Sequence, residues 1–168
     1  MNRAFTYSRQ SLLRSLAIVL AVFVSTAVIG AADGPIATIE QRIAGAERVV
    51  VAKVQHVSAS WRENRFGDRI IVSRIQLEVD EILKGSSDAT VFMEVDGGTL
   101  DGYTLRVSGL TVVQPGERGV FFLEPAVGGV HKPFLRGQGI LQLDSADYVR
   151  GTVMGLSEIR VKARSMGR

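Results

Sequence analysis

The sequence contains no cysteine among its 168 residues. This absence excludes disulfide scaffolds, zinc sites with cysteine ligands, thiol redox chemistry and cysteine nucleophiles. Histidine is nearly as scarce: His56 and His131 are the only two, and neither has a second ligand residue at metal-binding spacing. We therefore expect no bound metal and no other cofactor, and both histidines are predicted to be solvated or hydrogen-bonded.

The common catalytic motifs are also missing. No serine has the Gly-x-Ser-x-Gly context of a nucleophile, and no phosphate-binding glycine loop is present. Glu78 and Asp80 could act as an acid/base pair or hold a hard cation, but alternation places them on the wet face of a long strand. Glu94 and Asp96 repeat this pattern more weakly. We assign no catalytic residue and predict that the chain is not an enzyme.

The N-terminus has the three parts of a secretory signal. Arg3, Arg9 and Arg14 form a basic head, residues 15–32 are uncharged, and small residues close the segment. Cleavage after Ala32 fits best, and cleavage after Ala27 is nearly as good. The alternative is an uncleaved inner-membrane anchor, because the uncharged run is at the lower limit for a spanning helix. We predict an exported, periplasmic or secreted protein that contacts membrane only if residues 1–32 persist.

Removing this segment changes the charge balance. The first 32 residues hold three arginines and no acid, so residues 33–168 carry 17 basic and 17 acidic residues. A neutral chain lacks the cationic surplus that phosphate binding needs, and we expect no nucleic-acid partner. Residues 33–168 are long enough for a single domain with its own core.

Alternation of apolar and polar residues predicts that most of this domain is β-strand. It is clearest over 69–83, where one face is formed by Ile71, Ile75, Leu77, Val79 and Leu83. Other strands are expected at 49–57, 90–95, 100–107, 119–124, 139–143 and 148–153. The segment from Trp61 to Asp68 is predicted to be a hairpin loop.

Helices are expected only at the ends. Residues 33–46 read as a short helix in which Thr38 and Gln41 have capping-box spacing and Gly45 is a stop. Residues 158–164 fit a short helix capped by Ser157 or, equally, a strand. Five to seven strands with terminal helices predict an all-β barrel or sandwich.

Four short motifs resemble a family of uncharacterised exported bacterial proteins. They are Val49–Val54, Leu77–Gly85 (LEVDEILKG), Gly97-Gly98 and Pro115–Leu123 (PGERGVFFL), and the resemblance covers Thr38 to Leu141. More distantly, the plan is similar to the netrin-like domain of tissue inhibitors of metalloproteinases. The resemblance implies a five-stranded barrel of the oligonucleotide/oligosaccharide-binding (OB) type. It implies no activity.

One departure from those inhibitors matters. They chelate the protease zinc through an N-terminal cysteine, and this chain has none. Their mechanism therefore does not transfer, and neither does any functional residue.

The remaining candidates are aromatic residues beside arginines. Trp61 is the only tryptophan and stands near Arg62, Arg65 and Phe66, a composition typical of protein-binding hot spots. Trp61 could instead fold over the barrel rim as core. The weaker candidates are Tyr103, Arg106, Phe134 and Arg136.

We therefore expect a non-enzymatic binding domain whose partner is a protein or polysaccharide of the cell envelope or exterior. The alternatives are a membrane-anchored structural or accessory envelope protein and, third, a hydrolase whose site the sequence does not reveal.

Overall fold

The computed structural model describes residues 35–86 and 88–166, and all of these except Pro35 belong to a compact unit that begins at Ile36. The predicted signal segment, 1–32, lies outside the described residues. No helix in the described part is long and apolar enough to cross a bilayer.

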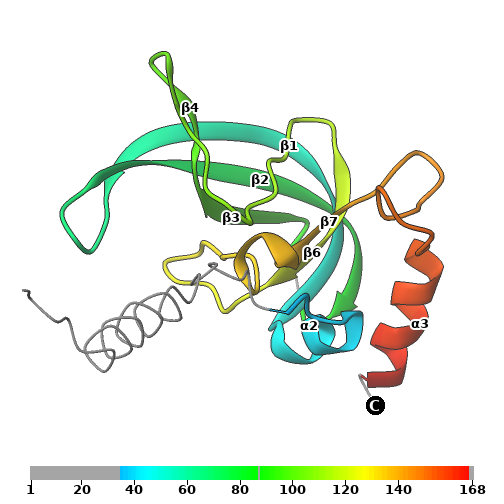
Figure 1. Cartoon of the computed structure of the whole chain (residues 1–168). Helices are drawn as coiled ribbons and strands as arrows, with labels where there is room; N and C mark the ends of the chain where they lie inside the picture. The colour runs from blue at the N-terminus through cyan, green and yellow to red at the C-terminus, as the bar shows by residue number, and fades with distance from the viewer. Residues whose placement is uncertain (1–34, 87, 167–168) are drawn as a thin grey trace, which may run out of the picture. The chain divides into compact units, whose positions relative to one another are not determined.

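Five antiparallel strands form the main sheet in the order β3-β2-β1-β6-β7 (Figure 1), which confirms the prediction of a mostly β domain. Their bounds are β1 Arg48–Glu63, β2 Arg69–Lys84, β3 Thr90–Asp96, β6 Arg118–Leu123 and β7 Ile140–Gln142. A separate hairpin pairs β4 (Gly98–Leu100) with β5 (Tyr103–Leu105). The helical segments are α2 (Ile39–Gly45), the 3-10 turn η1 (Arg136–Gly139) and α3 (Leu156–Met166).

Residues 49–52 of β1 and 119–123 of β6 are buried on both faces, which explains their nearly continuous apolar sequences. One face packs in a cluster contributed by the sheet strands, including Val50, Leu77 and Phe121. The other face packs against α2 and α3 in a second cluster that includes Val51 and Ile159. We call the first cluster the strand-side core and the second the helix-side core. The sheet is therefore a shared wall between two hydrophobic cores.

The predicted face of β2 is correct only in part. Ile71, Ile75 and Leu77 are buried and Val79 packs beside Leu77, but Leu83 packs in the helix-side core instead. The register against β1 skips Asp80 and then Leu83, so β2 carries extra residues at these points. Each extra residue shifts the alternation by one position and moves the following side chains to the opposite face.

The conspicuous Lys84-Gly85 pair has a structural role. The ammonium of Lys84 donates to the carbonyl oxygens of Ile43 (2.7 Å), Ala44 (3.0 Å) and Ala46 (2.6 Å), which satisfies the C-terminal end of α2. At Gly85 the φ angle is +76°, and a Cβ atom would lie 2.8 Å from the Glu47 carbonyl oxygen. This motif fixes the first helix to the sheet.

The Pro115–Arg118 motif is equally structural. Glu117 accepts a hydrogen bond from the Gln114 amide (2.9 Å) and pairs with Arg150 (2.8 Å). Arg118 pairs with Asp80 (2.8 Å) across β1. The motif therefore closes a turn and connects β6 to distant segments.

A short segment after β6 contacts two strands that are distant in the sheet order. The His131 amide donates to the Phe92 carbonyl of β3 (2.9 Å), and the Glu94 amide donates to the His131 carbonyl (2.9 Å). The Phe134 amide then donates to the Phe122 carbonyl of β6 (2.8 Å). Backbone hydrogen bonds through this segment thus connect the edge strand β3 with β6.

Several predicted boundaries are wrong. The first strand ends at Glu63 rather than 57, because residues 57–63 pair with β2, and only Asn64–Asp68 forms the turn. The expected strand 100–107 is reduced to the β4–β5 hairpin. The first helix is confined to Ile39–Gly45, with the Thr38–Gln41 capping box confirmed.

The expected strand at 148–153 is absent. Val149 makes only an isolated bridge to Leu143, and the chain then turns at Gly151, whose φ is +75°. Val153 is 96% exposed, so no second apolar position anchors a strand here. The C-terminal segment, which the sequence left as helix or strand, is helix α3; it begins at Leu156, so Ser157 lies in its first turn instead of capping it.

Leu77→Asp should prevent folding, because Leu77 is fully buried and its substitution places an unpaired charge in the strand-side core. Gln76→Asp should change the free energy of unfolding by less than about 0.5 kcal/mol, because Gln76 lies on the opposite, partly exposed face of β2. Urea denaturation of both variants tests the register. Equal effects would show that the assigned face is wrong.

Glu40 of α2 pairs with Lys162 of α3 at 2.5 Å. The hydrogen bond from Lys162, with smaller contributions from its own backbone amide and Thr38, lowers the pKa of Glu40 to about 2. A lowered carboxylate pKa stabilises the fold above the ordinary value of about 4.5, and this stabilisation is lost as the pH falls from 4.5 towards 2. Glu40→Gln should therefore flatten the decline of the thermal midpoint between pH 4.5 and 2. The effect will be small because both side chains are solvent-accessible.

The control is Glu63→Gln, which removes a carboxylate that has no ion pair in the described part of the chain. An unchanged slope in the Glu40 variant would contradict the assignment.

Candidate functional site

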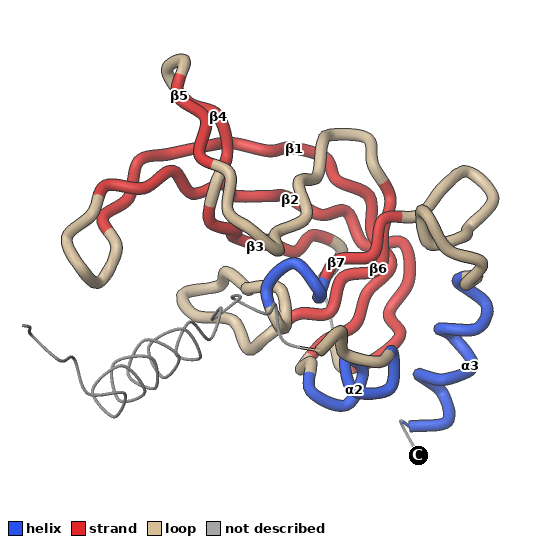
Figure 2. Tube along the Cα trace, viewed as in Figure 1, coloured by secondary structure: helices blue, strands red, loops and turns tan. Residues whose placement is uncertain are grey.

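Residues 57–63 of β1 pair with residues 69–75 of β2, and together with the turn between them they form an arm that extends beyond the rest of the sheet (Figure 2). Its tip is a structured turn. The Asn64 side-chain oxygen accepts hydrogen bonds from the Phe66 amide (2.8 Å) and the Asp68 amide (2.9 Å). Gly67 supplies the required positive φ of +86°. The tip is thereby held in one conformation that presents Arg65 and Phe66 to solvent.

Trp61 lies near the end of this arm in a cluster contributed by three elements. Its ring meets Tyr103 of β5 edge-on, with centroids 6.0 Å apart, and its indole N–H donates to Asp101 at 3.2 Å. The guanidinium of Arg69, from β2, lies 4.5 Å from the centroid of the indole ring. The indole is half-buried and Tyr103 is 67% exposed. We call Trp61, Arg69, Asp101 and Tyr103 the Trp61 cluster.

Two glycines allow the β4–β5 hairpin to reach Trp61. A Cβ atom on Gly98 would lie 2.4 Å from the Ser73 hydroxyl oxygen, so only glycine permits this approach to β2. The buried Ser73 hydroxyl donates to the Gly97 carbonyl at 2.7 Å. The Gly97-Gly98 motif is thus the crossing point at which the chain passes over the sheet.

The structure brings together only part of the predicted site. Trp61 and Tyr103 are in contact, whereas Arg65 stacks on the Phe66 ring at the arm's tip (4.7 Å), outside the cluster. Arg62 lies on the opposite face of the sheet, paired with Glu94 at 3.0 Å. Arg106 lines a cleft beside the hairpin. Neither Arg62 nor Arg106 belongs to the Trp61 cluster.

Sequence reasoning missed Arg69 and Asp101. Arg69 faces Trp61 because the arm's turn pairs Glu63 with Arg69, and this register places Trp61 and Arg69 on the same side. The register could have been inferred once the turn was narrowed to Asn64–Asp68. Asp101 depends on the crossing of a separate hairpin, for which the local sequence holds no signal.

Two adjoining clefts flank the segment that follows the hairpin. The first, about 850 Å³, lies between the arm's tip and the loop containing Lys132 and Arg136. The second, about 610 Å³, lies between β1 and residues 104–113 and has a largely apolar lining that includes Val57, Ala59, Val112 and Val113. Leu105, Val107 and Leu110 border both clefts.

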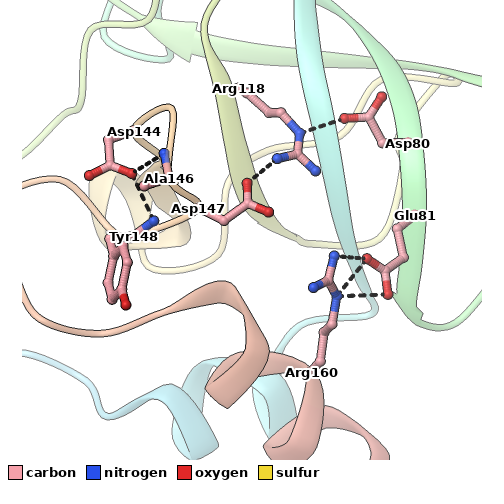
Figure 3. A network of polar contacts seen from close by, with 8 residues as sticks. All are labelled: Asp80, Glu81, Arg118, Asp144, Ala146, Asp147, Tyr148 and Arg160. Carbon is pink, nitrogen blue, oxygen red and sulfur yellow. Dashed lines mark hydrogen bonds and ion pairs between the residues drawn. The ribbon is translucent and has the colours of Figure 1, made fainter.

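The acidic candidates for catalysis are engaged elsewhere. Asp80 binds Arg118, which also pairs with Asp147, and Glu81 forms a two-pronged pair with Arg160 of α3 (Figure 3). These carboxylates raise the pKa of Arg118 and Arg160. Glu78 accepts a hydrogen bond from the Gln55 amide. These contacts tie α3 and the preceding loop to the sheet, so the network explains the acids of β2 structurally.

The histidines have no catalytic geometry. His131 is buried, and its Nδ1 lies 2.6 Å from the Glu124 carbonyl oxygen, which requires the proton on that nitrogen. His56 is exposed on β1. Within residues 35–86 and 88–166, no three His, Asp or Glu side chains gather as metal ligands would.

Comparison of the sequence with models of known protein families and with curated proteins returns no match.

Because Trp61 is the only tryptophan, its fluorescence reports on this cluster alone. Tyr103→Ala removes the ring that covers the indole edge and should red-shift the emission, increase quenching by acrylamide and lower the free energy of unfolding by about 0.5–1.5 kcal/mol. Tyr148→Ala, an exposed tyrosine on another loop, is the control and should leave the emission unchanged. Identical spectra for both variants would contradict the contact.

Proposed function

We propose that this chain is an exported, non-enzymatic binding domain that recognises a protein through the Trp61 cluster. The observation that carries the proposal is a solvent-accessible Trp–Tyr pair, assembled from distant segments and accompanied by Arg69. Aromatic rings with arginine are the side chains that contribute most to protein interfaces. The nearby turn adds Phe66, which is 74% exposed, with Arg65 stacked on it.

A protein partner is favoured over a polysaccharide. Sugar rings stack on an open aromatic face, and the Arg69 guanidinium already occupies one face of the indole. The Trp61 N–H is also committed to Asp101. What the cluster offers to a partner is therefore the Tyr103 ring and the cationic surface of Arg69.

We also propose that the sheet belongs to a small five-stranded barrel of the OB or netrin-like type. The support is the segment around His131, which hydrogen-bonds to β3, and the following Phe134, which hydrogen-bonds to β6. These hydrogen bonds link β3, at one end of the strand order, to β6, which is next to the other end. In such a barrel the core formed by the sheet strands would lie inside, and α2 and α3 would lie outside. The motifs shared with exported bacterial proteins agree with this proposal.

The proposal of export rests on the order of basic, apolar and small residues in 1–32. Cleavage would release a neutral domain beginning at Asp33. Non-enzymatic function is supported by the ion pairs and hydrogen bonds that hold Glu78, Asp80 and Glu81.

Trp61→Ala should weaken capture of a stoichiometric protein partner from the native host by at least about tenfold, because it removes the centre of the cluster. Affinity purification of the tagged full chain, followed by mass spectrometry and titration with the purified partner, measures the loss. Tyr148→Ala is the matched control, since Tyr148 is an exposed aromatic residue on a different loop.

N-terminal sequencing of the bait from the same sample should find a start near Asp33. A partner that binds both variants equally would overturn the assignment to the Trp61 cluster. A bait that retains Met1 and captures no protein would instead favour a membrane-anchored accessory domain.

A further inference from the structure

The arm of β1 has one open edge. β1 pairs with β2 along its length, but on its other side the pairing with β6 ends at Lys53. Two more hydrogen bonds follow, from the Val54 amide to Glu117 and from the Gly116 amide to Val54, both 2.8 Å. Beyond Val54, no backbone hydrogen bond joins this side of β1 to another part of residues 35–86 and 88–166. Residues 57–63 therefore present an unpaired strand edge.

The backbone N–H and C=O groups of successive strand residues alternate in direction, which shows which of them lie at this edge. The Asn64 amide donates to the Asp68 carbonyl across the hairpin (2.9 Å), so Asn64 points towards β2. Because successive residues of a strand point to opposite sides, Val57, Ala59 and Trp61 direct their N–H and C=O groups away from β2. Soluble proteins usually protect such edges, because another strand can pair with them.

An apolar cleft adjoins the same edge. Val57 and Ala59, whose backbone groups point outward, also contribute side chains to the 610 Å³ cleft. Residues opposite each other in a pair of strands share a face, so side chains of an added strand opposite Val57 and Ala59 would point towards this cleft. Val112, which is 74% exposed, lies at its lining. In β-strand addition, a peptide pairs through its backbone with an exposed strand edge, and its alternate side chains enter pockets beside that edge. The edge and the cleft of this chain have this arrangement.

The charges indicate the chemistry of the occupant. Arg65, Arg69 and Arg106 are exposed, and none has an ion pair within the described residues. Of the acids nearby, Asp68 accepts a hydrogen bond from the Asn64 side chain and Asp101 accepts one from Trp61, whereas Glu63, on the edge itself, has no ion pair in the described part of the chain. An acidic side chain at the end of an added strand would lie near these arginines.

We propose that residues 57–63 of β1 accept one extended segment of a partner protein as an added strand, with apolar residues at alternate positions and an acidic residue near the arm's tip. This inference rests on the proposed function and specifies how the partner is held. The Trp61 cluster stands at one end of the edge and the apolar cleft lies along it. The segment would thus be anchored by its backbone and selected by its alternate side chains.

A partner segment fits better than a second copy of this chain. A symmetric pairing of two β1 edges would bring a second β4–β5 hairpin, which rises across β1 in Figure 2, to the same edge. It would also bring Arg65 and Arg69 of both arms to one interface, where each arm adds one carboxylate that is free of an ion pair or side-chain hydrogen bond among the described residues, Glu63.

The probe is a blocked nonapeptide of alternating valine and threonine with glutamate at both ends, added to the full chain. Binding should protect the amides of Val57, Ala59 and Trp61 at least tenfold in hydrogen exchange, because they become hydrogen-bonded. The added strand is expected to run antiparallel to β1, as the neighbouring strands do. N-methylation of the valines should then abolish binding, since in an antiparallel pairing the residues facing the cleft direct their amides towards β1. N-methylation of the threonines should preserve it.

Ala59→Pro removes a backbone amide that points away from β2, a change that an edge strand tolerates. This variant should bind the peptide at least tenfold more weakly than the original chain. Ala59→Ser keeps the amide, and its affinity for the peptide should be within twofold of that of the original chain. The fluorescence of Trp61 verifies that both variants are folded, and the methylated peptides test the inference without any variant.

No binding below about 1 mM, or equal effects of the two methylated peptides, would overturn the inference. So would a concentration-dependent dimer that Ala59→Pro abolishes, because the occupant would then be a second copy. If the natural partner is lost with Trp61→Ala but retained with Ala59→Pro, the proposed function stands and strand addition is wrong.

Discussion

The long pairing of β1 with β2 is the constraint on which the rest of the structure depends. Both strands have 16 residues, whereas their other neighbours, β6 and β3, are much shorter. Where β1 also pairs with β6, it is covered on both faces and forms the wall between the two cores. Beyond Val54, β1 continues with β2 as the arm, which has an open edge. The buried part of β1 therefore stabilises the fold, and the arm carries the binding surface that we propose.

Extra residues in these strands decide where the side chains go. The skipped positions Asp80 and Leu83 turn Glu81 towards α3, where Arg160 holds it, and Leu83 towards the helix-side core. On β1, a further shift between Val54 and His56 occurs where the pairing with β6 ends. Different irregularities in the β1–β2 pairing thus attach the helices and mark the start of the arm. The Lys84-Gly85 motif attaches α2 to β2, and the Pro115–Arg118 motif attaches β6 to distant segments. The presence of these motifs in a sequence therefore indicates the fold and gives no information about an activity.

The Trp61 cluster depends on a tertiary crossing. Gly97 and Gly98 let the β4–β5 hairpin lie against Ser73, and this contact carries Asp101 and Tyr103 to the indole. A side chain at Gly98 would displace the hairpin and separate the cluster. The hairpin, the open edge and the apolar cleft then meet at one place on the arm, which makes that place the candidate interface.

Local pattern by itself determined much of the fold. Strict alternation located β2 and its buried Leu77, continuous apolar runs located β1 and β6, and Thr38 with Gln41 located α2, because these signals depend only on neighbouring residues. Trp61 and Tyr103 were singled out by residue type alone. Only the tertiary structure decided the face of Leu83, the loss of the strand at 148–153 and the recruitment of Arg69 and Asp101. The physical reason is that strand register, bulges and the crossing of a hairpin are set by packing between segments distant in the chain, which local sequence does not encode.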